Sequence, residues 1–186
     1  MPSSTSNSPS PSETRALSTA QPKKRIAIAA DHRGFELKRS LAAWLGEQGF
    51  AVTDLGPFND DPVDYPDYAA KVAEAVSLGQ DDFGVLICGT GIGMAMAANK
   101  FAGVRAANLT SPEFAALARQ HNAANVAALS GAFVDEGTNR QILSAFLGSE
   151  PLNDRHARRV AKIDALGQLR INPEPSHCGL GPQSLS

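Results

Sequence analysis

Short apolar runs alternate with longer segments of helical periodicity along most of this chain, and no other feature limits the possible folds as strongly. Arg25–Ala30 and Phe83–Cys88 are nearly continuous apolar runs, which is typical of strands covered on both faces. Further strands are expected at residues 51–56, 104–109 and 126–129, and helices at residues 35–49, 68–76, 92–101, 112–119, 136–147 and 154–169. Parallel strands joined by helical crossovers bury such a pattern compactly, so we predict a doubly wound, Rossmann-like α/β domain with a parallel sheet of about five strands.

The two ends of the chain differ in composition from the segment between them. Residues 1–22 are rich in serine and proline and contain few large apolar side chains, and residues 171–186 have the same character. Such segments bury too little apolar surface to offset the entropy lost when a backbone is ordered. We therefore predict disordered tails at residues 1–22 and 171–186 and a single folded domain at residues 23–170.

The overall composition argues against several classes of protein. The 17 Lys+Arg and 19 Asp+Glu leave a formal net charge of -2, and no basic run is interleaved with aromatic residues. A general nucleic-acid-binding surface is therefore not expected. No apolar stretch reaches the roughly 18 to 20 residues that span a bilayer, and no secretory signal is visible, so we expect no membrane partner and a cytoplasmic location. The four histidines are too scattered for a zinc-binding spacing, and no metal site is expected.

The segment Cys88-Gly89-Thr90-Gly91-Ile92-Gly93 follows an apolar strand and opens a helix, with glycines at alternate positions. Ligands of doubly wound sheets bind beyond the carboxyl ends of the strands. Glycines there allow backbone N–H groups to converge on an anion at the start of the helix. Met94 stands where the dinucleotide motif needs glycine, and no Gly-Lys-Ser/Thr follows, so a nucleotide site is disfavoured. The alternative is a tight turn without a ligand.

The two cysteines lie in different contexts and do not form a disulfide framework. Cys88 ends a strand and faces the start of a helix, where a thiolate is stabilised and can act as a base or nucleophile. A buried, inert cysteine is the alternative. Cys178 lies in the predicted tail, and we expect no function for it.

Other polar residues have both a functional and a plain structural interpretation. Asp31 and His32 follow the first strand, where they can exchange protons and hold an anion, or serve only as a helix cap and a solvated loop residue. The pair His121-Asn122 ends a polar helix and is equally ambiguous. Arg155 and Arg159 share one helix face, where they can fork a phosphate or simply form a solvated basic surface.

Taken together, these residues resemble the ribose-5-phosphate isomerase B family and its galactose-6-phosphate and allose-6-phosphate isomerase relatives. The likeness spans nearly the whole predicted domain, in order and at similar spacing, and both tails lie outside it. The matching segments are Asp31-His32-Arg33-Gly34-Phe35, Asp64-Tyr65-Pro66, Cys88-Gly89-Thr90-Gly91-Ile92-Gly93, Ala97-Ala98-Asn99-Lys100, Gly103-Val104-Arg105-Ala106, His121-Asn122 and Arg155-His156.

The resemblance implies isomerisation of a phosphorylated sugar between aldose and ketose through a cis-enediolate, without a metal or other cofactor. Ribose 5-phosphate to ribulose 5-phosphate is the leading reaction. On this interpretation Cys88 moves the proton between C1 and C2, Thr90 assists near the sugar hydroxyls, and Asp31 and His121 handle hydroxyl protons and ring opening. The implied substrate contacts are the N–H groups of Gly89, Gly91, Ile92, Gly93 and Met94 for the enediolate oxygen, Tyr65 and Asn122 for the sugar, and His32, Arg155 and Arg159 for the phosphate.

The resemblance also implies a homodimer, or a tetramer built from it, in which two subunits share each site and the neighbouring chain supplies His121 and Asn122. Two positions depart from the family pattern. Many members carry an arginine after the fifth strand that contributes to phosphate binding from the second subunit, where this chain has Ala132. A serine common after the glycine turn is Ala95 here. Another aldose phosphate, from tetrose to hexose phosphate, is therefore the alternative substrate. A sugar-phosphate-binding regulator is the alternative outside the enzymes, although a binder would not need Cys88 as a base.

Overall fold

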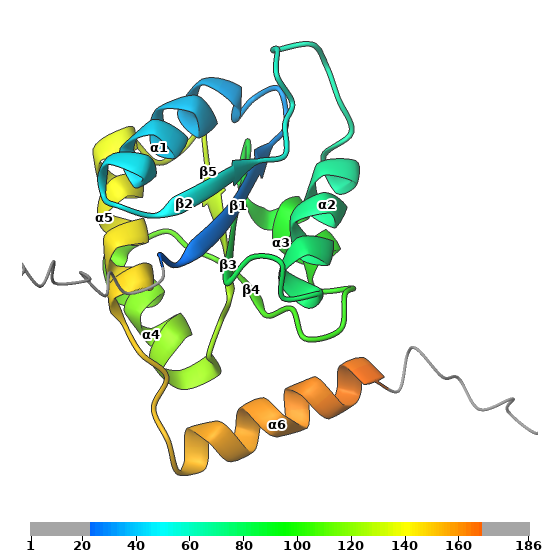
Figure 1. Ribbon diagram of the computed structural model, residues 1–186, viewed down its shortest axis with the longest axis vertical. Coiled ribbons are helices and arrows are strands. Elements are labelled where there is room, and N and C mark those ends of the chain that lie inside the picture. The colour runs from blue at the N-terminus through cyan, green and yellow to red at the C-terminus, as the bar shows by residue number, and fades with distance from the viewer. Residues whose placement is uncertain (1–22, 169–186) are drawn as a thin grey trace, which may run out of the picture.

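The computed structural model describes residues 23–168, and the tails predicted at residues 1–22 and 171–186 lie outside the described residues. Its centre is a five-stranded parallel sheet with the order β2-β1-β3-β5-β4. This architecture confirms the predicted doubly wound α/β fold (Figure 1). The strands are β1 (Arg25–Ala30), β2 (Ala51–Asp54), β3 (Phe83–Cys88), β4 (Ala106–Asn108) and β5 (Val126–Ser130).

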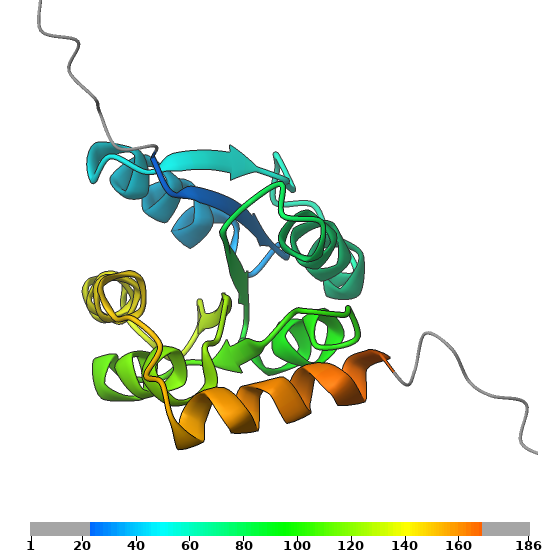
Figure 2. The ribbon, with the colours of Figure 1, turned by 60° about the horizontal axis from the view of Figure 1, so that its bottom comes forward.

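Helices cover both faces of the sheet. On one face lie α1 (Phe35–Glu47), α4 (Pro112–Asn122) and α5 (Glu136–Gly148), and on the other lie α2 (Tyr65–Ser77) and α3 (Ile92–Ala98). The last helix, α6 (Arg155–Gln168), lies outside these layers and packs against α4 (Figure 2). An ion pair of 2.8 Å between Arg105 and Asp164 ties α6 to the segment before β4.

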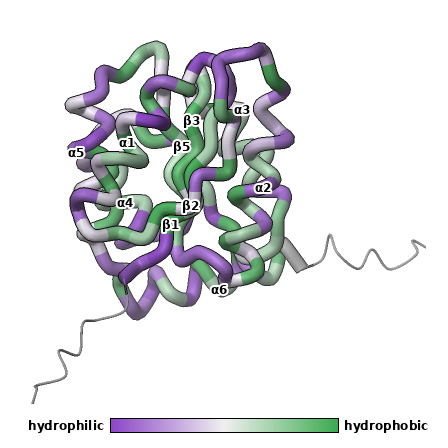
Figure 3. The backbone as a smooth tube through the Cα atoms, turned by 45° about the horizontal axis from the view of Figure 1, so that its top comes forward, coloured by the Kyte–Doolittle hydropathy of each residue, from purple (hydrophilic) through white to green (hydrophobic). Residues whose placement is uncertain are grey.

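The two faces of the central strands bury side chains of different size. Ile26 and Ile28 of β1 point into the core under α1 and α5, whereas Ala27 and Ala29 point into the core under α2 and α3. All residues of β3 are buried, because helices cover this strand on both faces. Figure 3 shows the apolar strands β3 and β5 at the centre of the molecule. The second face therefore carries small side chains, against which α2 and α3 pack.

Some element boundaries differ from the sequence prediction. α2 begins at Tyr65 instead of residue 68, because Pro66 occupies the first turn, where a missing N–H costs nothing. α3 ends at Ala98 instead of residue 101. The next side chain, Asn99, exchanges two hydrogen bonds of 2.8 Å with the backbone of Ala106 at the sheet edge. β4 is correspondingly short, because it pairs only with β5.

Candidate active site

The sheet topology brings the loops after β1 and β3 together. These strands are neighbours, and the chain leaves them in opposite directions, toward β2 and toward β5 and β4. The carboxyl ends of strands at such a reversal are the usual place for a ligand in this fold class. Asp31 follows β1, and its N–H donates to the carbonyl of Ile87 at 3.0 Å, one residue before Cys88. The two loops that the sequence singled out therefore adjoin.

Cys88 faces the glycine turn. Its Sγ accepts a hydrogen bond of 3.1 Å from the N–H of Gly91, and its side chain is buried but for 6% of its surface. Gly91 has a φ of 80°, a left-handed conformation that bends the chain back over the sulfur before α3 starts. The N–H groups of Gly93 and Met94 lie in the first turn of α3 and so have no acceptor within the helix. The thiol and the amide groups thus occupy the same turn.

Each glycine of this turn leaves room for a different neighbour. A Cβ at Gly91 would collide with Asn108 Nδ2 and lie 3.0 Å from the carbonyl of Leu129. A Cβ at Gly93 would lie 2.7 Å from Cζ of Tyr65. A Cβ at Gly89 would lie 3.4 Å from the guanidinium of Arg33. The alternation of glycines therefore reflects close contacts on several sides and not flexibility alone.

Residues at the carboxyl ends of β4 and β5 hold the turn in place through hydrogen bonds. Ser130 Oγ donates to the carbonyl of Gly89 at 2.8 Å, and the N–H of Gly131 donates to the carbonyl of Cys88 at 2.8 Å. Asn108 Nδ2 donates to the carbonyl of Thr90 at 3.0 Å. The sequence analysis did not identify Asn108 and Ser130. Both end strands at the ligand edge, so that position was the signal that would have found them.

Asp31 is not the helix cap that the sequence allowed, because the N-cap of α1 is Gly34 and has no side-chain cap hydrogen bond. Its Oδ1 accepts hydrogen bonds from the N–H groups of Arg33 at 2.9 Å and Gly34 at 3.0 Å, which organise the loop before α1. Oδ2 accepts none of the hydrogen bonds found within residues 23–168. One carboxylate oxygen is therefore structural, and the other is available to a substrate hydroxyl.

Tyr65, the first residue of α2, borders the same turn, whereas His32 contacts the segment before α2. His32 Nδ1 accepts a hydrogen bond of 3.4 Å from the N–H of Val63, which leaves Nε2 to carry the proton in the neutral ring. Tyr65 is 40% exposed, and its ring lies against Gly93. On the turn itself, Thr90 is exposed and its Oγ1 accepts from the N–H of Ile92 at 3.3 Å. Tyr65 and Thr90 therefore both lie at the glycine turn that Cys88 faces.

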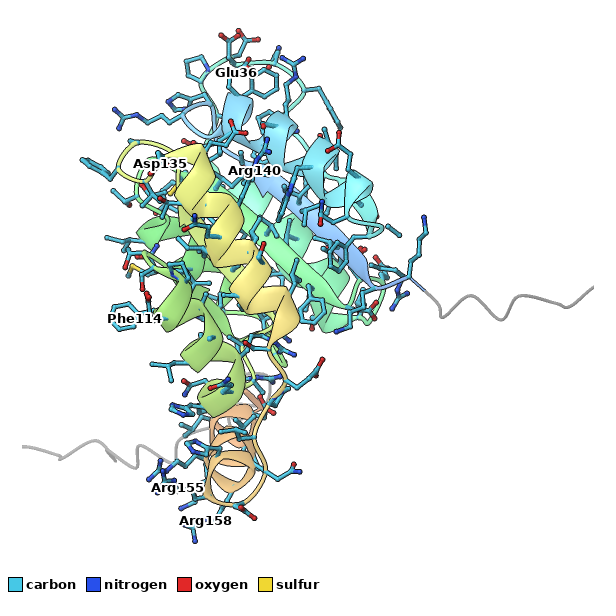
Figure 4. All side chains as sticks on the ribbon, turned by 90° about the vertical axis from the view of Figure 1, so that its left-hand side faces the viewer. Glu36, Phe114, Asp135, Arg140, Arg155 and Arg158 are labelled. Carbon is cyan, nitrogen blue, oxygen red and sulfur yellow. The ribbon has the colours of Figure 1, made fainter. Side chains whose placement is uncertain are left out.

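The remaining predicted residues lie at the other end of the molecule. α4 runs from the carboxyl end of β4 back to the start of β5, so His121 and Asn122 lie near the amino ends of the strands. β5 alone spans about 13 Å at roughly 3.3 Å per residue. Figure 4 shows Arg155 on α6 far from Glu36 and Asp135, which mark the starts of α1 and α5. Within one chain, the structure therefore does not bring His121, Asn122, Arg155 or Arg159 to Cys88 and His32.

These distant residues form a cluster of their own. The rings of His121 and His156 are stacked, with centroids 4.3 Å apart and planes 11° from parallel. Arg155 Nε donates to His156 Nε2 at 3.4 Å, and His156 Nδ1 is buried without a partner among the described residues. Burial lowers the pKa of His156, and the neighbouring His121, Arg155 and Arg159 lower it further. His156 was not predicted as a site residue, and no sequence pattern indicates this stack.

Residues 23–168 contain neither a metal-binding cluster nor a membrane-spanning helix. No group of three or more His, Cys, Asp or Glu side chains is placed to hold a metal ion. No helix in this range combines the length and apolar character needed to cross a membrane. Cys178 lies outside the described residues. The expectation of a cofactor-free site stays a prediction.

Comparisons with known proteins agree with the motifs. A family model described as Ribose/Galactose Isomerase matches residues 26–163. Ribose-5-phosphate isomerase B of Escherichia coli (strain K12) is 46% identical over 147 residues, which cover 79% of this chain and 99% of the relative.

Solved structures give the same result in three dimensions. Ribose-5-phosphate isomerase B of Clostridium thermocellum has a TM-score of 0.77 and 42% identity, covering 78% of this chain and 99% of that one. The structure of ribose-5-phosphate isomerase B from Mycoplasma genitalium with bound ribulose-5-phosphate has a TM-score of 0.75 and 46% identity, covering 77% and 96%. The chain therefore belongs to the ribose/galactose isomerase family, as its motifs predicted.

Proposed function

We propose that this protein is a ribose-5-phosphate isomerase of the B type, which interconverts ribose 5-phosphate and ribulose 5-phosphate through a cis-enediolate. The hydrogen bond between Gly91 N–H and Cys88 Sγ carries the proposal, because it places a candidate base and the amide donors on one turn. The family membership and the names of the relatives support the same reaction.

The chemistry assigns separate tasks to the thiol and the turn. After the sugar ring has opened, the Cys88 thiolate removes the proton from C2, and the electron pair moves toward the carbonyl oxygen at C1. The N–H groups of the turn from Gly89 to Met94 stabilise the negative charge on that oxygen. The hydroxyl proton on O2 is transferred to O1, and the protonated thiol returns its proton to C1, so that the electron pair left on O2 forms the C2 carbonyl of the ketose. A thiol that is not stabilised as a thiolate is a poor base for a carbon acid. The same turn must therefore stabilise both the Cys88 thiolate and the enediolate.

Proton transfers on oxygen fall to the residues around the turn. Asp31, through Oδ2, and His121 exchange protons with the hydroxyl groups during ring opening, and Thr90 assists near them. Tyr65 and Asn122 position the sugar. His32, Arg155 and Arg159 bind the phosphate with charge-assisted hydrogen bonds.

This division of tasks requires two copies of the chain. Within one chain, Cys88 and His121 lie at opposite ends of the sheet, so one subunit contributes the glycine turn and its partner contributes α4 and α6 to each site. We therefore infer a homodimer with two shared sites, or a tetramer built from such dimers. The cytoplasmic location expected from the sequence stays a prediction.

A coupled assay over four-, five- and six-carbon aldose phosphates tests the reaction and the substrate length together. We expect the largest kcat/KM with ribose 5-phosphate, and the same rate with a chelator present. Preference for a tetrose or hexose phosphate would select the alternative suggested by Ala95 and Ala132. No turnover of any aldose phosphate would contradict the enzyme and favour the binding regulator.

Hybrid dimers test the shared site. Cys88→Ala and His121→Ala chains are each expected to be inactive alone, but a mixed dimer contains one site with both residues intact. Random exchange then restores about a quarter of the wild-type activity, because half of the dimers are hybrids and one of their two sites works. Measured exchange without any recovery would show that each site is built from one chain.

A further inference from the structure

Arg33 lies against the glycine turn, although the proposed reaction has given it no task. A Cβ at Gly89 would lie 3.4 Å from both Cδ and Nη1 of Arg33 and 3.9 Å from its Cζ. The guanidinium therefore covers Gly89, the residue directly after Cys88. The backbone of Arg33 also adjoins β5, because a Cβ at Gly131 would lie 3.1 Å from the Arg33 carbonyl oxygen. Arg33 thus stands between the ends of β3 and β5.

The guanidinium of Arg33 is free to bind a ligand. Arg33 is exposed, and within residues 23–168 its side chain forms no ion pair and donates no hydrogen bond. The other described arginines outside α6 all have partners, which are Asp82 for Arg25, Glu36 for Arg39, Asp164 for Arg105, the Ala124 carbonyl for Arg119 and Glu136 for Arg140. A free guanidinium at the ligand edge of the sheet has its full set of donors available to an anion.

The backbone that carries Arg33 is firmly held. Its N–H donates to Asp31 Oδ1 at 2.9 Å, and the N–H of Gly34 donates to the Asp31 carbonyl at 3.1 Å. Gly34 packs so closely on β3 that a Cβ there would lie 2.6 Å from Cγ2 of Ile87. The loop therefore presents the side chain from a fixed point, and only the rotamers of Arg33 itself need ordering when a ligand binds.

Position 132, from which the resemblance implied a phosphate contact by the second subunit, lies beside Gly89 of its own chain. The N–H of Ala132 donates to the carbonyl of Gly89 at 3.2 Å, so position 132 and Arg33 both border Gly89. Ala132 carries no charge. His32, to which the proposed function assigns phosphate binding, precedes Arg33 in the sequence.

We infer that Arg33 binds the phosphate group of the substrate beside Gly89 and supplies the positive charge that Ala132 does not. This inference rests on the proposed sugar-phosphate isomerase function. Two N–H groups of a guanidinium match two phosphate oxygens, and the pairing strengthens substrate binding without participating in proton transfer at carbon. Arg33 is accordingly a binding residue, and its loss acts on KM.

Steady-state kinetics with ribose 5-phosphate test the inference in Arg33→Ala. We expect KM to rise about 10- to 100-fold with kcat within about threefold of wild type. Arg39→Ala is the matched control, because Arg39 is an exposed arginine of the following helix that pairs with Glu36, and it should leave both constants unchanged. A fall in kcat at unchanged KM would place the guanidinium at the reacting carbons and overturn the phosphate assignment.

Relocating the charge sharpens the test. Adding Ala132→Arg to Arg33→Ala should restore part of the lost affinity, because both positions border Gly89. A double variant no better than Arg33→Ala would refute the idea that Arg33 replaces a cation at position 132.

Calorimetric titration separates this inference from the proposed function. Ribose 5-phosphate is titrated into Cys88→Ala and Cys88→Ala/Arg33→Ala, where turnover cannot interfere, and the second Kd should be weaker by the same factor as KM. Equal Kd values overturn the role of Arg33 even if the wild-type protein is an active isomerase. Conversely, a wild-type protein that turns over no aldose phosphate contradicts the proposed function, whereas a difference in Kd still supports Arg33 as an anion ligand.

Discussion

The two groups of site residues in this chain are held in place by different means. The group around Cys88 is fixed by backbone hydrogen bonds between strand ends, such as those from Gly131 to Cys88 and from Ser130 to Gly89. The group around His121 is held by side chains, through the stack on His156 and the packing of α6 on α4. The group around Cys88 is therefore fixed to the sheet, whereas the geometry of the group around His121 depends on the packing of α6 against α4. Under the proposed function, Cys88 acts at carbon from the rigid group, whereas Arg155 and Arg159 bind the phosphate from the group that depends on α6.

The largest effect is expected from Cys88→Ala. Removal of the base from the rigid group should lower kcat by about 10²- to 10⁴-fold, because general bases contribute factors of that size. Thermal unfolding should stay close to wild type, since Cys88 leaves only a small gap at an edge of the core. A near-normal kcat would show that another group removes the proton.

Arg155→Ala and Arg159→Ala examine the second group. Each should raise KM for ribose 5-phosphate about tenfold or more while kcat changes little, because the lost interaction is with a phosphate that does not react. Kinetics with the phosphorylated and the unphosphorylated sugar provide the measurement. Equal losses with both sugars would argue against phosphate recognition by α6.

Gly91→Ala tests the rigidity of the turn. Alanine at a φ of 80° is strained by about 1–2 kcal/mol, and its Cβ would also collide with Asn108. We expect a lower midpoint of denaturant unfolding together with reduced kcat. Gly103→Ala is the matched control, because its φ is 73° but nothing lies within 4 Å of its Cβ. Equal destabilisation of the two variants would mean that the contact with Asn108 adds nothing.

The smallest effect concerns the pH dependence of stability. Because the pKa of His156 is lowered in the folded protein, the unfolded chain binds a proton at this residue more readily than the folded protein does. His156 therefore lowers the free energy of unfolding as the pH falls below about 6.5. We expect a larger fall in the unfolding midpoint between pH 7.5 and pH 5.5 for wild type than for His156→Phe, at one protein concentration. The same fall in both proteins would exclude His156 as the source.

How far the sequence alone predicted the site depended on how local each interaction is. The turn from Cys88 to Met94 was predicted from consecutive residues, because glycine spacing and a strand end are local signals. Asn108 and Ser130 were missed, because they support that turn from strands distant in sequence. Arg33 was named only as part of a family motif, because the residues next to it in the sequence do not indicate that its guanidinium covers Gly89. The contact of His121 with His156 depends on the placement of α6, which no pattern in the sequence specifies.

The alternation of apolar runs and helical segments determined the fold class, because only a sheet covered on both faces buries that pattern. The motifs determined the family in the same way, through residues that lie close together along the chain. Strand order, the supporting contacts beneath the glycine turn and the separation of His121 from Cys88 were decided only by the tertiary structure. Those features arise from packing between distant segments, where the free energy of contact depends on shape and position that a linear sequence does not display.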